Sequence, residues 1–211
     1  MARLEVVRIM SAMVRGQRGH YARGRERRDA LIDSAIEVIA ERGLERVTFR
    51  MVAEHAGYPP STTSYFFATV DELVVAAVNR VAETITRRVD SLLQMAREGL
   101  LSHEQLASSL VDLVANQDNS GSIAQFEAYL AVRRRPELGP PVQRIMGVLE
   151  EAARQTFEVL GVADPSISAR LLVGLLDGYT LHEIAWPSGP ESRDMLRDLL
   201  SRMLDTHGAP R

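Results

Sequence analysis

The sequence predicts an all-α fold of about nine helices, and three observations lead to this prediction. Apolar residues recur every three or four positions nearly everywhere, and no segment alternates convincingly as a half-buried strand does. Hydrophobic residues make up 45% and charged residues 25% of the chain, as in ordinary globular proteins. A chain of 211 residues without cysteine can bury roughly 70% of its unfolded surface, so it needs no disulfide to fold.

The first predicted helix covers residues 28–42 and is followed by Gly43, a residue type that commonly ends helices. Its apolar positions are three or four residues apart, which is the spacing of an amphipathic helix. They are Leu31, Ile32, Ala35, Ile36 and Ile39. This helix therefore has one face that must pack against other elements.

Two short helices come next. Thr48 fits an N-cap for a helix that runs to about Ala56, and Gly57 stops this helix. Pro60 suits the first turn of the next helix, which runs through about Phe67. Neither helix is long enough to be stable alone, so both need the preceding helix to close a small core. This order predicts a helix-turn-helix unit, whose second helix enters the major groove of DNA.

The remaining helices are longer. Thr69 fits the N-cap of a helix that continues to about residue 97. Further amphipathic helices are predicted, separated by polar or proline-containing turns. They cover residues 102–117, 123–132, 142–160, 166–186 and 191–206.

The second short helix has an unusual composition. Its first residues, 61–64, all carry hydroxyl groups, and three aromatic residues follow. Hydroxyl groups can donate to phosphates and reach base edges without a long flexible stem. Tyr65 could reach a phosphate while its ring contacts a sugar or a thymine methyl group. Phe67 is nearly two turns after Ser61 and is predicted to anchor the helix in the core.

The charge of the chain is distributed unevenly. Residues 1–28 contain eight arginines and two glutamates, whereas the whole chain has a formal net charge of −3. All 25 basic residues are arginine, so any cationic phosphate contact would use a guanidinium group. We consider three interpretations of this segment: a solvated tail, an arm that contacts DNA, and an early translation start upstream of Met10 or Met13.

The segment TFRMVAEHAGYPPSTTSYFFATVDEL, residues 48–73, resembles the DNA-binding motif of the tetracycline-repressor family. The resemblance implies a helix-turn-helix domain over residues 26–75 and a helical effector-binding and dimerisation domain over 76–211. The uneven charge adds a basic N-terminal arm over residues 1–25. The resemblance assigns DNA contacts to Thr48, Arg50, Ser61, Thr62, Ser64 and Tyr65, with Phe66, Arg27 and Arg28 as further candidates. Two roles are open for Phe66, which could pack on a thymine methyl group or against its own domain.

The sequence departs from the family pattern at several positions. Pro59 stands where the family usually has a capping serine, and Thr63 stands where a buried leucine is usual. Phe66 replaces a frequent histidine, and Val70 replaces a frequent phosphate-binding lysine. We therefore expect cationic contacts with DNA to come from Arg50 and from the N-terminal arginines.

By the same resemblance, the last two long helices are expected to form a four-helix bundle with a second subunit; packing within one subunit is the alternative. The residues assigned to this interface are Leu172, Leu175, His182, Leu196, Leu199 and Met203. A ligand pocket is expected among the helices from residue 76 onward. Its candidate lining residues are Met95, Phe126, Tyr129, Met146, Phe157, Tyr179 and Trp186, and their character points to a hydrophobic or aromatic effector.

Other function classes lack support in the sequence. There is no nucleophile elbow, paired-carboxylate motif or phosphate-binding loop, and His182-Glu183 lacks the second histidine of a zinc-binding HExxH motif. We therefore predict no catalytic residue, metal or cofactor. No apolar run is long enough to span a membrane, and Arg8 interrupts the apolar run near the N-terminus, so a cytoplasmic location is expected.

The sequence thus predicts a ligand-responsive repressor that binds a pseudo-palindromic operator as a homodimer. Two alternatives remain at this point. One is a helical protein that binds small molecules or other proteins and has lost specific DNA binding. The other is a DNA-binding protein that responds to no effector.

Overall fold

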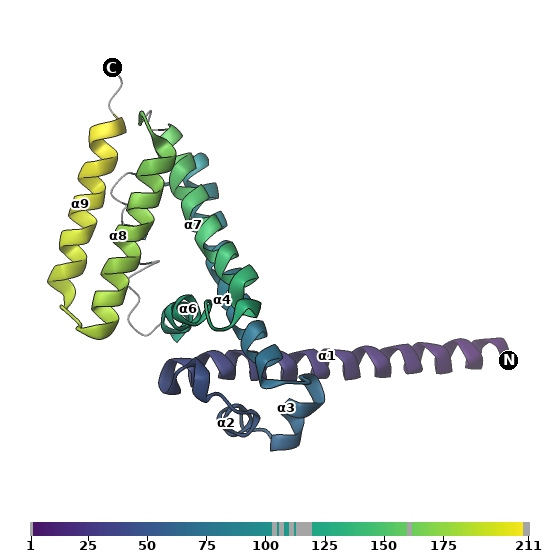
Figure 1. Cartoon of the computed structure of the whole chain (residues 1–211). Helices are drawn as coiled ribbons and strands as arrows, with labels where there is room; N and C mark the ends of the chain where they lie inside the picture. The colour runs from purple at the N-terminus through teal and green to yellow at the C-terminus, as the bar shows by residue number, and fades with distance from the viewer. Residues whose placement is uncertain are drawn as a thin grey trace.

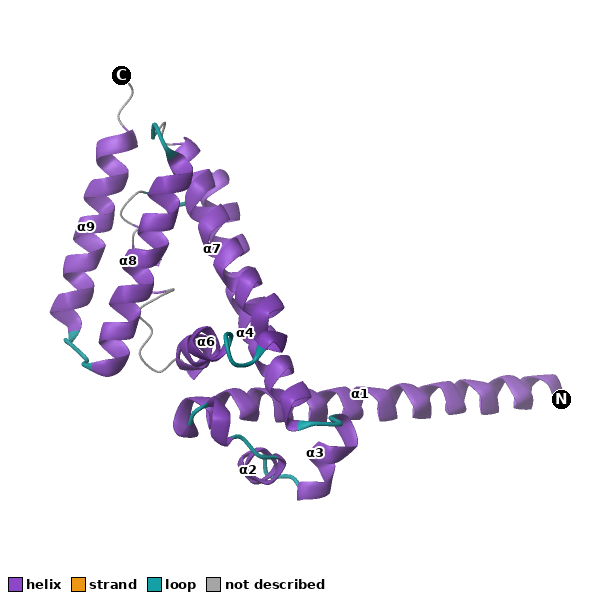
Figure 2. Ribbon diagram, viewed as in Figure 1, coloured by secondary structure: helices purple, strands orange, loops and turns teal. Residues whose placement is uncertain are grey.

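The computed structural model describes residues 2–102, 105, 108, 109, 112, 120–159 and 162–208, and within these ranges the side chains of residues 22–158 and 162–202. These residues form helices joined by short turns and contain no strand (Figure 2). The predicted all-α fold is therefore confirmed. Most of the helix predicted at residues 102–117 lies outside the described residues.

The chain begins with one long helix, α1 (Ala2–Arg42), followed by the 3₁₀ turn η1 (Leu44–Arg46). The predicted helix at residues 28–42 is present, but it is only the last part of α1. Figure 1 shows the N-terminal half of α1 extending away from the other helices. The arginine-rich segment is thus helical in this structure, which agrees with the high helix propensity of arginine.

The helix-turn-helix unit consists of α2 (Phe49–His55) and α3 (Pro60–Phe66). The turn between them is closed by two backbone bonds, from Gly57 N–H to Glu54 and from Tyr58 N–H to Ala53. This is the Schellman arrangement, and Gly57 adopts the positive φ of 71° that it requires. Because side chains other than glycine are strained there, the position of Gly57 fixes where α2 ends.

The C-terminal helices are α4 (Val70–Arg97), α6 (Ser120–Ala131), α7 (Gly139–Val159), α8 (Pro165–Ala185) and α9 (Pro190–Gly208), with a 3₁₀ turn η2 (Pro136–Leu138) before α7. The start of α4 is capped as predicted, since Thr69 Oγ1 accepts a hydrogen bond from Glu72 N–H at 3.0 Å. In Figure 1, α7 runs beside α4, and α8 and α9 form the side of the molecule away from α2 and α3.

One hydrophobic core joins the N-terminal and C-terminal helices. It contains Leu31 of α1, Phe67 after α3, Val78 of α4, Ala128 of α6 and Ile145 of α7. The predicted domain boundary near residue 75 lies inside α4 and inside this core. Movement of the C-terminal helices can therefore reach α1 through direct packing.

Candidate nucleic-acid interface and internal cavity

The two faces of α3 separate anchoring residues from exposed ones. Thr63 and Phe67 are buried, and the Thr63 hydroxyl donates to the carbonyl oxygen of Phe49 at 3.4 Å. This bond explains how a hydroxyl group is accommodated where the family usually packs leucine. Ser61 and Ser64 are exposed, and the Tyr65 side chain is 80% exposed. The outward face of α3 therefore presents small polar groups and one large ring.

The other residues at the start and end of α3 have structural partners. Pro59 occupies the N-cap and makes no side-chain cap bond, as its chemistry requires. Thr62, in the first turn, is partly buried. Ser64 Oγ donates to the Ser61 carbonyl oxygen at 3.1 Å. Phe66 is partly buried against the core, with its ring edge-on to Tyr65, which favours the second of its two roles.

Residues of α1 and α2 flank α3. Thr48 Oγ1 accepts a hydrogen bond from Met51 N–H at 3.2 Å, so this residue caps α2. Arg50 is exposed and forms an ion pair with Glu54 at 2.7 Å. Exposed pairs of this kind contribute little to stability because water screens them, so a phosphate could take the place of Glu54 at little cost.

Two neighbouring arginines of α1, Arg27 and Arg28, differ in environment. Arg27 and Arg28 are both exposed, but the Arg28 guanidinium lies 5.1 Å from the centre of the Phe67 ring. Arg28 therefore has a cation–π contact within the unit, whereas Arg27 makes no contact of this kind among the described residues. The sequence did not predict the contact of Arg28, because it depends on how α1 packs across the end of α3.

Polar contacts tie the C-terminal helices to this unit. Glu127 of α6 accepts a hydrogen bond from Leu44 N–H in η1 at 3.0 Å. Arg135, just before η2, forms an ion pair with Asp71 of α4 at 2.6 Å. Helix α6 therefore holds the element that connects α1 to α2, and the segment before η2 holds the start of α4.

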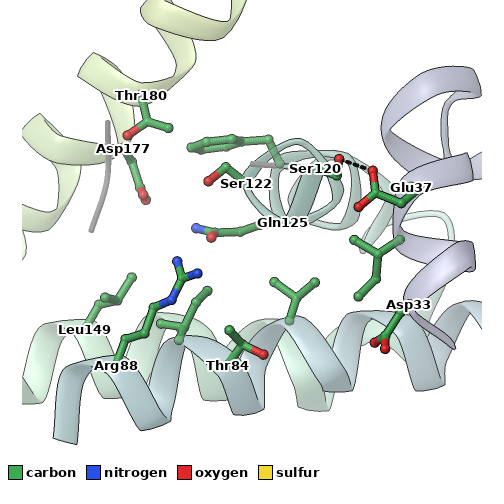
Figure 3. A pocket seen from close by; sticks show the side chains of 15 residues that line it. Asp33, Glu37, Thr84, Arg88, Ser120, Ser122, Gln125, Leu149, Asp177 and Thr180 are labelled. Carbon is green, nitrogen blue, oxygen red and sulfur yellow. Dashed lines mark hydrogen bonds between the residues drawn. The ribbon is translucent and has the colours of Figure 1, made fainter. Parts of the chain in front are cut away.

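A cavity of about 290 Å³ lies between α1, α4, α6, α7 and α8 (Figure 3). Ile36, Ile85, Phe126 and Leu149 form apolar parts of its wall, and Gln125 is among the polar ones. This volume lies near the lower end of the range for small-molecule sites. The cavity also directly borders α1, so a bound ligand would contact the first helix of the helix-turn-helix unit.

Most residues predicted to line the pocket lie elsewhere. Phe126 lines this cavity, and Tyr129 lies one turn further along α6 with its ring edge-on to Phe126. Met95 lines a neighbouring cavity beside α4. Tyr129 and the four remaining residues line neither cavity. Met146 and Trp186 are exposed, Phe157 is buried, and Tyr179 contacts Ser192 of α9.

Asp177 is one of the polar cavity residues that the sequence did not single out. It projects into the cavity from α8, and Arg88 projects from α4 on the other side (Figure 3). Burial raises the pKa of Asp177 to about 6, because a desolvated carboxylate is disfavoured. Burial, followed by the charge of Asp177, also raises the pKa of Tyr129. Only the packing of α8 against α6 reveals this environment, since an isolated Asp on a helix gives no such signal.

Asp177→Asn is expected to stabilise the protein at pH 8. The carboxyl group has a pKa of about 6 when folded, compared with an ordinary value of 3.8, so the folded state binds more protons in this interval. The ionised carboxylate therefore destabilises the folded state fully above the folded pKa, and this destabilisation disappears as the pH falls to about 4. Partial exposure reduces the expected gain from roughly 3 to about 1 kcal/mol.

Urea unfolding of the wild type and of Asp177→Asn at pH 8 and pH 4 measures this difference. Asp33 and Glu37 of α1 and Arg88 of α4 also line the cavity, and they are the same in both proteins. The exposed Asp164→Asn, just before α8, removes an equal charge and is expected to change the free energy of unfolding by less than about 0.5 kcal/mol. Equal or lower stability of Asp177→Asn at pH 8 would contradict the assignment.

The exposed sides of α8 and α9 carry apolar residues. They are Ile167, Leu171, Leu175, Leu181 and Ile184 on α8, and Met195 and Leu199 on α9. Gly174 and Gly178 are exposed among them, and a Cβ added at either would meet no atom within 4 Å. We call this set the outer apolar face. Exposed apolar patches commonly mark protein–protein contacts.

The six residues assigned to a subunit interface are distributed over different environments. Leu175 and Leu199 belong to the outer apolar face, and His182 is also exposed. Leu172 is partly buried, and Leu196 is buried within the subunit because its side of α9 packs inward. The Met203 side chain lies outside the described residues. Leu171, which precedes Leu172, is exposed but was not among the six residues.

The described residues contain neither a metal-binding cluster nor a membrane-spanning helix. No group of three or more His, Asp or Glu side chains in this part of the chain could hold a metal ion. Among the same residues, no helix is long and apolar enough to cross a membrane.

Comparisons with known proteins agree with this geometry. Residues 31–77 match the family model "Bacterial regulatory proteins, tetR family", and residues 101–206 match "Tetracyclin repressor-like, C-terminal domain". The chain is similar to the nicotine-responsive transcriptional repressor HdnoR of Paenarthrobacter nicotinovorans. The identity is 26% over 197 residues, which cover 87% of this chain and 96% of that protein.

Solved structures show the same relationship. A member of the TetR family from Streptomyces coelicolor A3 is 30% identical with a TM-score of 0.64, and the match covers 84% of this chain and 98% of that chain. The multidrug binding protein EbrR complexed with proflavin is 30% identical with a TM-score of 0.56, covering 84% of this chain and 99% of that one.

Proposed function

Because the chain belongs to the tetracycline-repressor family of helix-turn-helix transcriptional regulators, we propose that it represses transcription by binding a pseudo-palindromic DNA operator as a homodimer, until a small ligand enters its cavity. The observation that carries this proposal is the division of α3 into a buried and an outward face. Thr63 and Phe67 hold the helix, while Ser61, Ser64 and Tyr65 are free of the core. The proposed place of action is the cytoplasm.

The proposed DNA contacts follow from this orientation. Tyr65, Ser61 and Ser64 are directed toward the major groove, and Thr62 contacts it from the edge of the helix. Arg50 and Arg27 supply positive charge to the flanking phosphates, because α3 itself carries none. Arg28 keeps its contact with Phe67 and adds to the positive field around the helix start.

The proposed dimer forms through the outer apolar face. This surface supplies branched side chains around two exposed glycines, so helices of two copies could pack closely there. A two-fold axis that lies in this face and runs toward the α2–α3 end would place two α3 helices on the same side of the dimer. Two recognition helices in that arrangement read two half-sites of a pseudo-palindrome.

The proposed effector is a small molecule with an aromatic ring. The apolar part of the cavity wall and the Phe126 and Tyr129 rings support this class, as do the similar proteins, one named as nicotine-responsive and one complexed with proflavin. A ligand in contact with α1 and α6 would act on η1 through Glu127. Such a ligand lowers operator affinity only if it binds the DNA-free arrangement more tightly.

An electrophoretic mobility shift with DNA from upstream of the protein's own gene tests the proposal. The wild type is expected to bind specifically, and the affinity is expected to fall steeply with salt because arginine–phosphate contacts release counterions. The double variant Thr62→Ala/Tyr65→Ala is expected to bind at least about 30-fold more weakly, from lost groove contacts of about 1–3 kcal/mol each. Specific binding that is unchanged in this variant would show that α3 is not the reading helix.

A further inference from the structure

We propose that the effector carries a positive charge and that the carboxylate of Asp177 is its counter-ion. This inference rests on the proposed function, because it concerns the ligand of the same cavity. It adds a chemical class, an organic cation, and one residue that selects for it. The reasons are the partners of the charged residues around the cavity, the composition of the wall and the cavity volume.

The carboxylates that line the cavity differ in their partners. Asp33 accepts a hydrogen bond from Arg80 at 3.0 Å, and Glu37 accepts one from the Ser120 hydroxyl. Asp177 has no hydrogen bond or ion pair among the described residues, although it is partly buried. A buried carboxylate without a partner is costly, and a ligand cation would remove that cost.

The side chains near Asp177 suit a flat cation. Phe126 lines the cavity, and its ring is edge-on to Tyr129, with ring centres 5.7 Å apart. Aromatic faces attract cations as well as other rings. Gln125 lines the same wall and donates through Nε2 to the Tyr129 hydroxyl at 2.9 Å, which leaves its carbonyl oxygen as an acceptor for a ligand N–H group.

An anionic ligand fits this cavity less well. Three carboxylates, Asp33, Glu37 and Asp177, line it, whereas Arg88 is the only cationic side chain among its described lining residues. Arg88 also lines the neighbouring cavity, where Asp112 is present. The balance of charge among the lining residues therefore favours a cationic ligand. An anionic or zwitterionic ligand would need Arg88 as its partner. A volume of about 290 Å³ suits a compact ligand of two or three fused rings.

Calorimetric titration with proflavin and acridine at pH 8 tests this inference with two ligands that share one ring system. Proflavin is cationic at this pH and acridine is largely neutral. The full-length wild type is expected to bind proflavin at least about tenfold more tightly than acridine. Asp177→Asn is expected to lose about tenfold in proflavin affinity and to keep its acridine affinity within about twofold.

Two further variants separate the local role of Asp177 from a general charge effect. Asp164→Asn has the same change in net charge outside the cavity, and its proflavin affinity is expected to stay within about twofold of the wild type. Arg88→Gln is expected to bind proflavin as tightly as the wild type or more tightly, because a like charge is removed. Loss of proflavin binding in Arg88→Gln would overturn the cation assignment.

The inference is also overturned if the wild type binds the two ligands equally, binds neither, or binds proflavin unchanged after Asp177→Asn. None of these results bears on DNA recognition, which the mobility shift without ligand measures separately. Because Asp177→Asn is expected to fold more stably than the wild type, its loss of affinity cannot be ascribed to unfolding. The same protein is expected to bind operator DNA normally and to resist release by proflavin.

Discussion

The double variant Leu171→Arg/Leu175→Arg is expected to be monomeric and to bind a two-half-site operator at least about 100-fold more weakly than the wild type. Both side chains belong to the outer apolar face, and they are 69% and 45% exposed in one subunit. In a dimer they would be buried, where unpaired arginines from both copies would be costly. A monomer reaches only one half-site at a time and loses the gain from linked binding, which is typically 10²–10⁴-fold.

Light scattering coupled to size exclusion measures the mass, and mobility shifts with one and two half-sites measure the affinity. The affinity for a single half-site is expected to change little, because α3 is far from the substituted face (Figure 1). Leu130→Arg is a matched control, since Leu130 is an exposed leucine on α6 outside this face. A variant that stays dimeric, or a control that dissociates equally, would place the subunit contact elsewhere.

The parts of the fold that the sequence predicted best are those fixed by local chemistry. Thr48 and Thr69 cap α2 and α4 through bonds that span three residues. Gly57 is needed because its φ is positive, and Pro60 occupies the first turn of α3 because proline lacks the N–H that a first turn leaves unpaired. These signals involve neighbours in sequence, so they can be read without knowledge of the packing.

The parts that the sequence did not predict depend on contacts between distant segments. The environment of Asp177 arises where α8 packs against α6 and faces α4 across the cavity, and the position of Arg28 over Phe67 arises where α1 crosses the end of α3. The spacing of apolar residues also did not determine which side of α9 is buried. In the structure Leu196 is buried and Leu199 is exposed. Both residues suit an apolar stripe, and only the direction of packing decides which one meets the core.

Phe67→Ala is expected to destabilise the protein by about 3–5 kcal/mol and to abolish specific DNA binding. The side chain is 1% exposed and belongs to the core shared by α1 and α4. Replacing it removes the apolar contact that holds α3 and leaves a cavity beside α1. Because α3 has only seven residues and cannot be stable alone, loss of its anchor should release it from the orientation needed for the major groove. Urea unfolding at fixed protein concentration measures the stability, and a mobility shift measures the binding.

Tyr65→Ala and Arg28→Ala separate the possible causes of such an effect. Tyr65 is an aromatic residue of α3 two positions before Phe67, but it is exposed, so its replacement is expected to change stability by less than about 0.5 kcal/mol while weakening DNA binding. Arg28→Ala removes the cation above the Phe67 ring and is expected to cost about 0.5–1 kcal/mol. If Phe67→Ala and Tyr65→Ala lowered stability equally, Phe67 would not be the anchor. If Tyr65→Ala bound DNA as the wild type does, the outward face of α3 would lose its proposed role, whatever the result for Phe67.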